Sequence, residues 1–120
     1  MTDANCIFCR IVRGEIPAKK IHEDAEVIAF HDVRPQAPVH LLIIPKAHVA
    51  TLYDAEAAHI PALGRMLAIA GKLAREAGAA EGFRSIINTG PVGHQEVYHV
   101  HMHVLGGPEP LGPMLQRKRP

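Results

Sequence analysis

The spacing of hydrophobic residues along the chain predicts two helices. Residues 6–14 place apolar side chains at positions 7, 8, 11 and 12 ahead of a glycine, which predicts a short amphipathic helix. A second apolar stripe at helical spacing ends before Gly78 and comprises Leu63, Leu67, Ala70, Leu73, Ala74 and Ala77. Because a proline ring clashes with the carbonyl four residues back, Pro61 marks the start of this helix. The pattern therefore predicts one long helix, over about residues 61–77.

Apolar and β-branched runs predict five strands, at residues 19–23, 26–31, 40–45, 83–89 and 97–105. Turn-forming residues separate them, including the proline-rich residues 34–38 and the glycines of residues 90–93. This order of elements favours an antiparallel sheet with one helix packed against it, an α+β fold. Residues 106–120 contain four prolines and a short basic run, and we expect an irregular, solvated C-terminal arm there.

The length and composition describe one ordinary domain spanning residues 1–120. A chain of 120 residues suits a single core, and 48% hydrophobic with 21% charged residues argues against disorder. The net charge of +1 argues against a nucleic-acid partner. The longest aliphatic run, residues 41–44, is too short to span a membrane, and the N-terminus does not resemble a signal peptide. We expect a cytoplasmic protein.

The chain has nine histidines, and three of them alternate near its end: His99, His101 and His103. On a strand, alternate side chains point to one face, so these imidazoles would form a row with steps of ~6.6 Å, from a rise of ~3.3 Å per residue. The apolar residues between them would then face the core. Because burying several imidazoles costs desolvation energy, the row indicates a functional site.

Two kinds of chemistry suit a row of histidines. A zinc site made of all three is disfavoured, because ligands ~6–7 Å apart are awkward around an ion that binds at ~2.0–2.1 Å. The alternative is nucleophilic catalysis: one neutral imidazole attacks an electrophile such as phosphorus, a second protonates the leaving group, and a third group orients the nucleophile. The middle histidine, His101, is the natural nucleophile.

Residues 99–105, His-Val-His-Met-His-Val-Leu, match the pattern His-x-His-x-His-x-x with apolar x, and the chain resembles the histidine triad (HIT) superfamily. Further matching stretches occur along nearly the whole chain: residues 14–18, 29–33, 35–40, 44–46, 88–90 and 95–98. The chain is most similar to the bacterial type of the HINT branch, the purine nucleoside phosphoramidases. This resemblance implies a HIT-like fold, a five-stranded antiparallel sheet with one main helix and a short N-terminal helix.

The resemblance also implies roles for individual residues. His101 would be the nucleophile and form a covalent nucleotidyl-histidine that water hydrolyses; His103, His40 and Asn88 would complete the catalytic set. The implied nucleotide-binding residues are Phe30, His31, Asp32, Val33, Asn88, His94, Gln95, Glu96, Val97, His101 and His103. Among these, the Asp32 carboxylate would accept hydrogen bonds from the ribose hydroxyls.

The chain departs from the family pattern at two of these positions. Glu96 stands where many eukaryotic relatives have serine, and its charge would repel a phosphate unless it is protonated or turned away. His94 replaces a common glycine, so a residue with a side chain must tolerate the local dihedral angles. We assign both residues to specificity rather than to the central chemistry.

Cys6 and Cys9 form a C-x-x-C pair on one predicted helical turn, which is half of a tetrahedral zinc site. The residues themselves leave two alternatives open, a pair of reduced thiols or a redox pair, although the latter needs a βαβ context. The resemblance implies His48 and His99 as the other two ligands of a structural zinc ion that would fix the N-terminal helix to the sheet. No organic cofactor is expected, and His22 and His59 are expected at the surface.

The resemblance therefore implies a homodimeric hydrolase that cleaves the P–N bond of purine nucleoside phosphoramidates, such as adenosine phosphoramidate or lysyl-AMP, and releases AMP. Guanosine forms stay open, and the dimer rests on the resemblance, in which the long helix and residues 83–89 meet their symmetry mates. Within the same class, a dinucleoside polyphosphate hydrolase or a nucleotidyl transferase is the alternative. From another class, the alternative is a non-catalytic nucleotide-binding protein organised by zinc.

Overall fold

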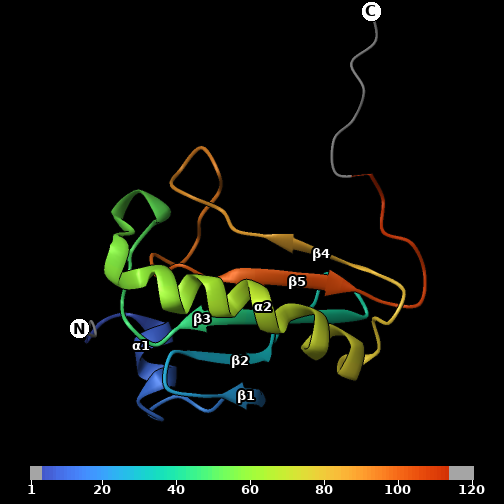
Figure 1. The fold of residues 1–120 in the computed structure, drawn as a ribbon, viewed down its shortest axis with the longest axis horizontal. Helices are drawn as coiled ribbons and strands as arrows, with labels where there is room; N and C mark the ends of the chain where they lie inside the picture. The colour runs from blue at the N-terminus through green and yellow to red at the C-terminus, as the bar shows by residue number, and fades with distance from the viewer. Residues whose placement is uncertain (1–3, 114–120) are drawn as a thin grey trace, which may run out of the picture.

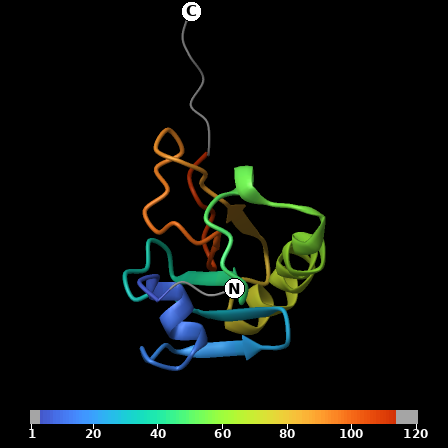
Figure 2. The ribbon, with the colours of Figure 1, turned by 90° about the vertical axis from the view of Figure 1, so that its left-hand side faces the viewer.

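The computed structural model describes residues 4–113, which form a five-stranded antiparallel sheet with a helix on each face (Figure 1, Figure 2). The elements in chain order are α1 (Ile7–Val12), β1 (Lys20–Glu23), β2 (Val27–His31), β3 (Val39–Pro45), the 3-10 turns Leu52–Asp54 and Ala57–His59, α2 (Ile60–Ala77), β4 (Phe83–Ile86) and β5 (Met102–Gly106). The strand order is β1-β2-β3-β5-β4. The predicted α+β architecture, with its five strands, main helix and short N-terminal helix, is confirmed.

β2 and β3 are buried on both faces, and their alternate residues divide between two cores. On the α2 side, buried apolar residues of the sheet pack with the helix, and they include Val27, Ala29, Leu41, Ile43, Met102 and Val104. On the α1 side, the second core consists of Phe8, Ile11, Ile28, Phe30, Leu42 and Ile44. The period of two along each strand produces this division, because successive side chains point to opposite faces of a sheet.

Helix α2 begins one residue before Pro61 and ends where Gly78 adopts a left-handed conformation, with φ of 114°. Its buried stripe includes Met66 and Ala70, whereas Leu67, which the spacing had placed in the stripe, is 60% exposed. Met66 takes the position against the sheet, and Leu67 lies about 100° further around the helix. Within residues 4–113, neither helix has the length and apolar character that crossing a membrane requires.

The last two strands are shorter than predicted. The strand expected from residue 97 begins at Met102, because the chain bends at residues 97–99 and the Val100 amide donates to the Val49 carbonyl instead of to a neighbouring strand. The strand expected to reach residue 89 ends at Ile86, whose partner on β5 is His103. Because β5 begins at Met102, the residues after Ile86 have no β5 partner with which to continue the β4–β5 hydrogen bonds.

The register of β3 and β5 brings two predicted site residues to the α1 face. Leu42 pairs with His103, and two residues further along the ladder His40 pairs with Leu105. Since Leu42 packs on the α1 side, His40 and His103 lie on that face as well. Of the predicted arm, residues 107–113 form no helix or strand, and residues 114–120 lie outside the described residues.

Asp24 connects the β1–β2 turn to α2. One carboxylate oxygen accepts from the amides of Glu26 and Val27, at 2.8 and 3.0 Å, and the other accepts from His22 Nε2 and Arg65 Nε, both at 2.6 Å. Burial alone would raise the pKa of this carboxyl, but the four hydrogen bonds outweigh burial and lower the pKa well below its usual range.

We predict that Asp24→Asn lowers the free energy of unfolding by about 1–2 kcal/mol at pH 7, because the amide cannot accept all four hydrogen bonds. A lowered folded-state pKa stabilises the fold above the unfolded-state pKa of ~3.9, and this contribution is lost as the pH falls toward the folded-state pKa. In urea denaturation, the gap between wild type and variant should therefore narrow below about pH 4. Glu76→Gln, on the exposed face of α2, is the control and should change stability by less than about 0.5 kcal/mol. A gap as large at pH 3 as at pH 7 would contradict this account of Asp24.

Candidate functional site

A cavity of about 760 Å³ opens on the α1 face of the sheet. α1, the ends of β2 and β3, and the segment that leads into β5 form its walls. It is lined by all the predicted nucleotide-binding residues except Gln95, namely Phe30, His31, Asp32, Val33, Asn88, His94, Glu96, Val97, His101 and His103. The predicted catalytic residue His40 lines it too. The structure brings these residues to one place, while their roles stay predictions.

His101 is buried and has one of its two ring nitrogens fixed by the backbone. Nδ1 lies 2.8 Å from the carbonyl oxygen of His99, which can only accept, so Nδ1 carries the proton and Nε2 carries a lone pair. Burial lowers the pKa of His101, against the opposing effects of the His99 carbonyl and the carboxylates of Asp32 and Glu96. The ring is therefore neutral at pH 7, with a nucleophilic nitrogen.

A chain of hydrogen bonds fixes the protons of His40 and His103. The backbone amide of Gln36 donates to Nδ1 of His40 at 2.9 Å, so a neutral His40 carries its proton on Nε2. That nitrogen lies 2.9 Å from Nδ1 of His103, which must accept and leaves an N–H on Nε2 of His103. Burial lowers the pKa of both rings, so both are neutral at pH 7. His103, with an N–H on Nε2, therefore lies beside His101, with a lone pair on Nε2, and the two ring centroids are 5.1 Å apart.

Asp32 lies beside the hydrogen-bonded pair of His40 and His103, and one of its carboxylate oxygens accepts from a backbone amide. Its Oδ1 accepts from the amide of Arg34 at 2.8 Å, and its Oδ2 lies 3.4 Å from Nε2 of His40. Asp32, His40 and His103 present donor atoms within 4.8 Å of one another, close enough for a metal ion. However, Nδ1 of His40 accepts from the Gln36 amide, so the proton of the neutral ring is on Nε2 and points to His103. A protonated Nε2 has no lone pair with which to bind an ion. The hydrogen-bond chain thus favours an acid–base site over a metal site.

Side-chain hydrogen bonds of Gln95 brace the segment between β4 and β5. Its Oε1 accepts from the Gly90 amide at 2.9 Å, and its Nε2 donates to the carbonyls of Ala50 and Val97 at 2.7 and 3.0 Å. Gln95 is buried and is not among the residues that line the cavity, so its role in nucleotide binding stays a prediction. Its three hydrogen bonds brace this segment, which presents Asn88 and Glu96 to the cavity.

Two residues of this segment have demanding backbone positions. His94 adopts a positive φ of 59°, and no other described non-glycine residue in residues 4–113 does so. The segment thus accepts a side chain where glycine is less strained. At Gly93, an added Cβ would lie 2.6 Å from the Thr89 carbonyl oxygen, so no side chain fits. The exposed imidazole of His94 reaches the cavity wall through this turn.

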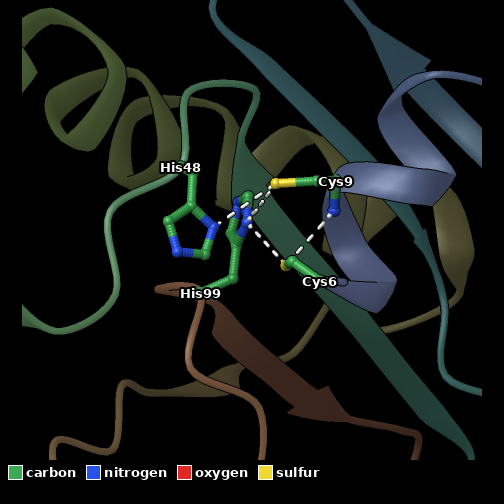
Figure 3. A group of neighbouring side chains, drawn as sticks. All are labelled: Cys6, Cys9, His48 and His99. Carbon is green, nitrogen blue, oxygen red and sulfur yellow. Dashed lines mark hydrogen bonds between the residues drawn. The ribbon is translucent and has the colours of Figure 1, made fainter. Parts of the chain in front are cut away.

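Figure 3 shows a second cluster, in which Cys6 and Cys9 of α1 face His48 and His99. Nδ1 of His99 lies 3.3 Å from Sγ of Cys6 and 3.5 Å from Sγ of Cys9, and Nδ1 of His48 lies 3.3 Å from Sγ of Cys9. Residues from three distant parts of the chain, predicted as one ligand set, thus lie together. Burial lowers the pKa of His99 to about 4, so its Nδ1 lone pair is available.

The donor atoms of this cluster fit a tetrahedral zinc site. With bonds of ~2.0–2.3 Å, neighbouring ligand atoms of a tetrahedron lie ~3.3–3.8 Å apart, and the separations of 3.3 to 3.5 Å fall in that range. Nε2 of His99 donates to the Pro45 carbonyl at 2.7 Å, which orients Nδ1 toward the sulfurs. The Cys9 amide donates to the Cys6 sulfur at 3.4 Å.

The histidines without a predicted role have structural contacts. His22 bonds Asp24, and Nδ1 of His59 accepts from the Glu56 amide at 2.9 Å ahead of α2. Sequence reasoning missed the apolar wall of the cavity that Phe8, Ile11 and Leu42 form. The apolar face of residues 7, 8 and 11 was visible, but only the tertiary packing of α1 directs it to the cavity.

Fold and site together define a class: α+β proteins in which a run of alternating histidines leads into an inner strand of an antiparallel sheet, beside a cavity of about 760 Å³. The chain belongs to the HIT family, because the model of the HIT domain matches residues 13–109. Both cysteines of the second cluster precede this matched segment.

Individual relatives match almost end to end. The purine nucleoside phosphoramidase of Escherichia coli K12 is 53% identical over 113 residues, which cover 93% of this chain and 94% of that protein. A 14 kDa zinc-binding protein of Brassica juncea is 48% identical over 84% of this chain and 91% of its own length. Among solved structures, a HIT family hydrolase from Clostridium thermocellum superposes with a TM-score of 0.88 at 41% identity, covering 95% of this chain and 100% of that chain.

Proposed function

We propose that this protein hydrolyses the P–N bond of purine nucleoside phosphoramidates through a covalent nucleotidyl-histidine on His101. The observation that carries the proposal is the lone pair on Nε2 of His101, fixed by the 2.8 Å hydrogen bond of Nδ1 to the His99 carbonyl. The E. coli phosphoramidase, at 53% identity, supports the class of substrate. Lowered histidine pKa values support attack by a neutral imidazole at pH 7.

In the first step, Nε2 of His101 bonds to phosphorus and the P–N bond breaks. The departing nitrogen takes up one proton from solvent and leaves as a neutral amine, while the N–H of His103 donates a hydrogen bond to the reacting phosphoryl group. In the second step, water attacks phosphorus, the bond to His101 breaks, and AMP and one proton are released. The proton taken up in the first step balances the proton released in the second.

The rest of the cavity suits a purine nucleoside monophosphate. Phe8, Phe30 and Val33 offer apolar surface for the base, and the free acceptor positions of Asp32 suit the ribose hydroxyls. Asn88 can donate to a phosphoryl oxygen. His94 and Glu96, which the same segment presents to the cavity, are assigned to specificity.

Protein incubated with adenosine phosphoramidate and quenched in acid should carry the added mass of AMP, on His101, in the mass spectrum. His101→Ala should lose the adduct and at least ~10³-fold in kcat, because it removes the nucleophile. His59→Ala, a histidine outside the cavity, is the control and should keep both adduct and rate. Hydrolysis by His101→Ala at the parent rate would refute the mechanism, and faster turnover of a diadenosine polyphosphate would favour the alternative substrate class.

We also propose a structural zinc ion held by Cys6, Cys9, His48 and His99, which would tie α1 to the sheet. The fit of the donor atoms and the zinc-binding relative support it. Elemental analysis of protein purified without chelators should give about one zinc per chain, since four ligands complete a tetrahedral site, and Cys9→Ser should abolish it. Wild type with no zinc under these conditions would contradict the assignment. Cys6 and Cys9 are not joined in a disulfide, which also fits the cytoplasmic location that we propose.

The chain is further proposed to form a homodimer through α2 and β4. Ile60 and Leu67 are 66% and 60% exposed on α2, and Phe83 is 39% exposed on β4, which is an edge strand. Such exposed apolar residues beside an unpaired edge suit an interface between copies.

Light scattering should give the mass of two chains at micromolar concentration, and Leu67→Glu should shift it to one, because the charge would be buried in the interface. Lys72→Glu, about 140° around the same helix, is the control and should stay dimeric. A wild-type monomer would refute the dimer.

A further inference from the structure

Helix α1 belongs to both sites. Its N-cap residue Cys6 and its residue Cys9 supply the two sulfurs of the second cluster, whereas Ile7, Phe8 and Ile11 line the cavity. A helix of six residues is not stable by itself, so its position depends on what holds it. Whatever holds the sulfurs therefore also helps to position one wall of the cavity.

Two sets of contacts hold α1 in place. Phe8 and Ile11 pack into the smaller core with Phe30 and Leu42. The sulfurs face the imidazoles of the cluster at 3.3 to 3.5 Å, distances at which a thiol makes only weak hydrogen bonds. A metal ion would replace these weak contacts by coordination bonds and hold the first turn of α1 to the sheet.

His99 is the second shared residue. Its buried imidazole faces both sulfurs through Nδ1, and its own carbonyl oxygen accepts the Nδ1 proton of His101. Since Nε2 bonds the Pro45 carbonyl, the ring and the backbone of His99 are restrained together. The ligand set and the orientation of the proposed nucleophile therefore meet in one residue.

Phe8 contacts both sites from α1. Its ring lies edge-on to His99 and to His101, with centroid distances of 5.8 and 5.1 Å, and edge-on to Phe30 at 5.9 Å. Phe8 thus touches a proposed metal ligand and the proposed nucleophile, and it forms part of the cavity wall.

We propose that the two sites are thermodynamically coupled: a metal ion held by Cys6, Cys9, His48 and His99 strengthens nucleotide binding in the cavity, and the nucleotide strengthens metal binding by the same factor. The coupling runs through α1, with Phe8 as the positioning residue. It rests on the proposed function, since it takes both a metal and a nucleotide as ligands. Linkage makes the two factors equal, and coupling of this kind typically amounts to about 5- to 150-fold.

Calorimetric titration with AMP should show binding at least about fivefold weaker to zinc-free than to zinc-loaded protein. In the reciprocal measurement, zinc transfer from the loaded protein to a chromogenic chelator should need a correspondingly stronger competitor when AMP is saturating. Equal AMP affinity in the two forms overturns the coupling. A zinc-free chain that is unfolded by circular dichroism also overturns it, because the linkage would then be global rather than through α1.

Variants on α1 test the route. Phe8→Leu keeps the site apolar but removes the ring contacts, so the ratio of the two AMP affinities should fall toward one while zinc content stays unchanged. Arg10→Ala, an exposed position of the same helix, should leave the ratio unchanged. An undiminished ratio in Phe8→Leu overturns the role of this ring.

The outcomes also separate the coupling from the proposed function. Protein that takes up no zinc overturns the metal assignment together with the coupling. Zinc-loaded protein that binds no AMP overturns the nucleotide function and the coupling. Protein that binds both ligands independently overturns the coupling alone.

Discussion

The hydrogen bond from Nδ1 of His101 to the His99 carbonyl oxygen, 2.8 Å long, decides which nitrogen of the central imidazole carries a proton. A free imidazole exchanges its proton between two nitrogens, and only one tautomer presents a lone pair to the cavity. The carbonyl can hold the ring because His99 is itself fixed at both of its nitrogens. The cluster of Cys6, Cys9, His48 and His99 thus helps to orient the His101 imidazole through His99.

Burial and hydrogen bonding act together on the other histidines. Burial lowers the pKa of His40 and His103, which keeps both neutral near pH 7 in spite of the nearby carboxylate of Asp32. In neutral rings the backbone amide of Gln36 can set the proton positions through two rings in succession. Two protonated rings at this separation would repel each other, so the arrangement depends on the desolvation that the fold provides.

Much of this architecture could be predicted from residue spacing. The apolar runs of β2 and β3 agree with their burial on both faces, and Pro61 with Gly78 delimits α2 to within one residue. The alternating histidines predicted a strand over residues 97–105, but β5 begins at Met102, so only His103 of the three lies within it. The chain bends before Met102, where the side chain of His99 meets the sulfur of Cys6, a contact between residues more than ninety apart that no local pattern reports.

The site shows the same division. Spacing and side-chain chemistry indicated the histidine row and the Cys6–Cys9 pair, whereas the resemblance to the HIT superfamily implied the other cavity residues and His48 and His99 as ligands. The fold brings the four residues of the cluster together and lines the cavity with most of the others. Backbone partners escaped prediction, because the Gln36 amide and the His99 carbonyl have no signature in side-chain identity. The bracing contacts of Gln95 also escaped prediction, because its amide bonds three backbone groups that only the folded loop brings together.

The most direct test of this account is the tautomeric state of the three histidines, measured by nitrogen-15 NMR of the imidazole rings at neutral pH. The account predicts a proton on Nδ1 of His101 and an unprotonated Nε2, with the reverse assignment, a proton on Nε2, for His40 and His103. A proton on Nε2 of His101, or a rapid average of both tautomers there, would contradict the account.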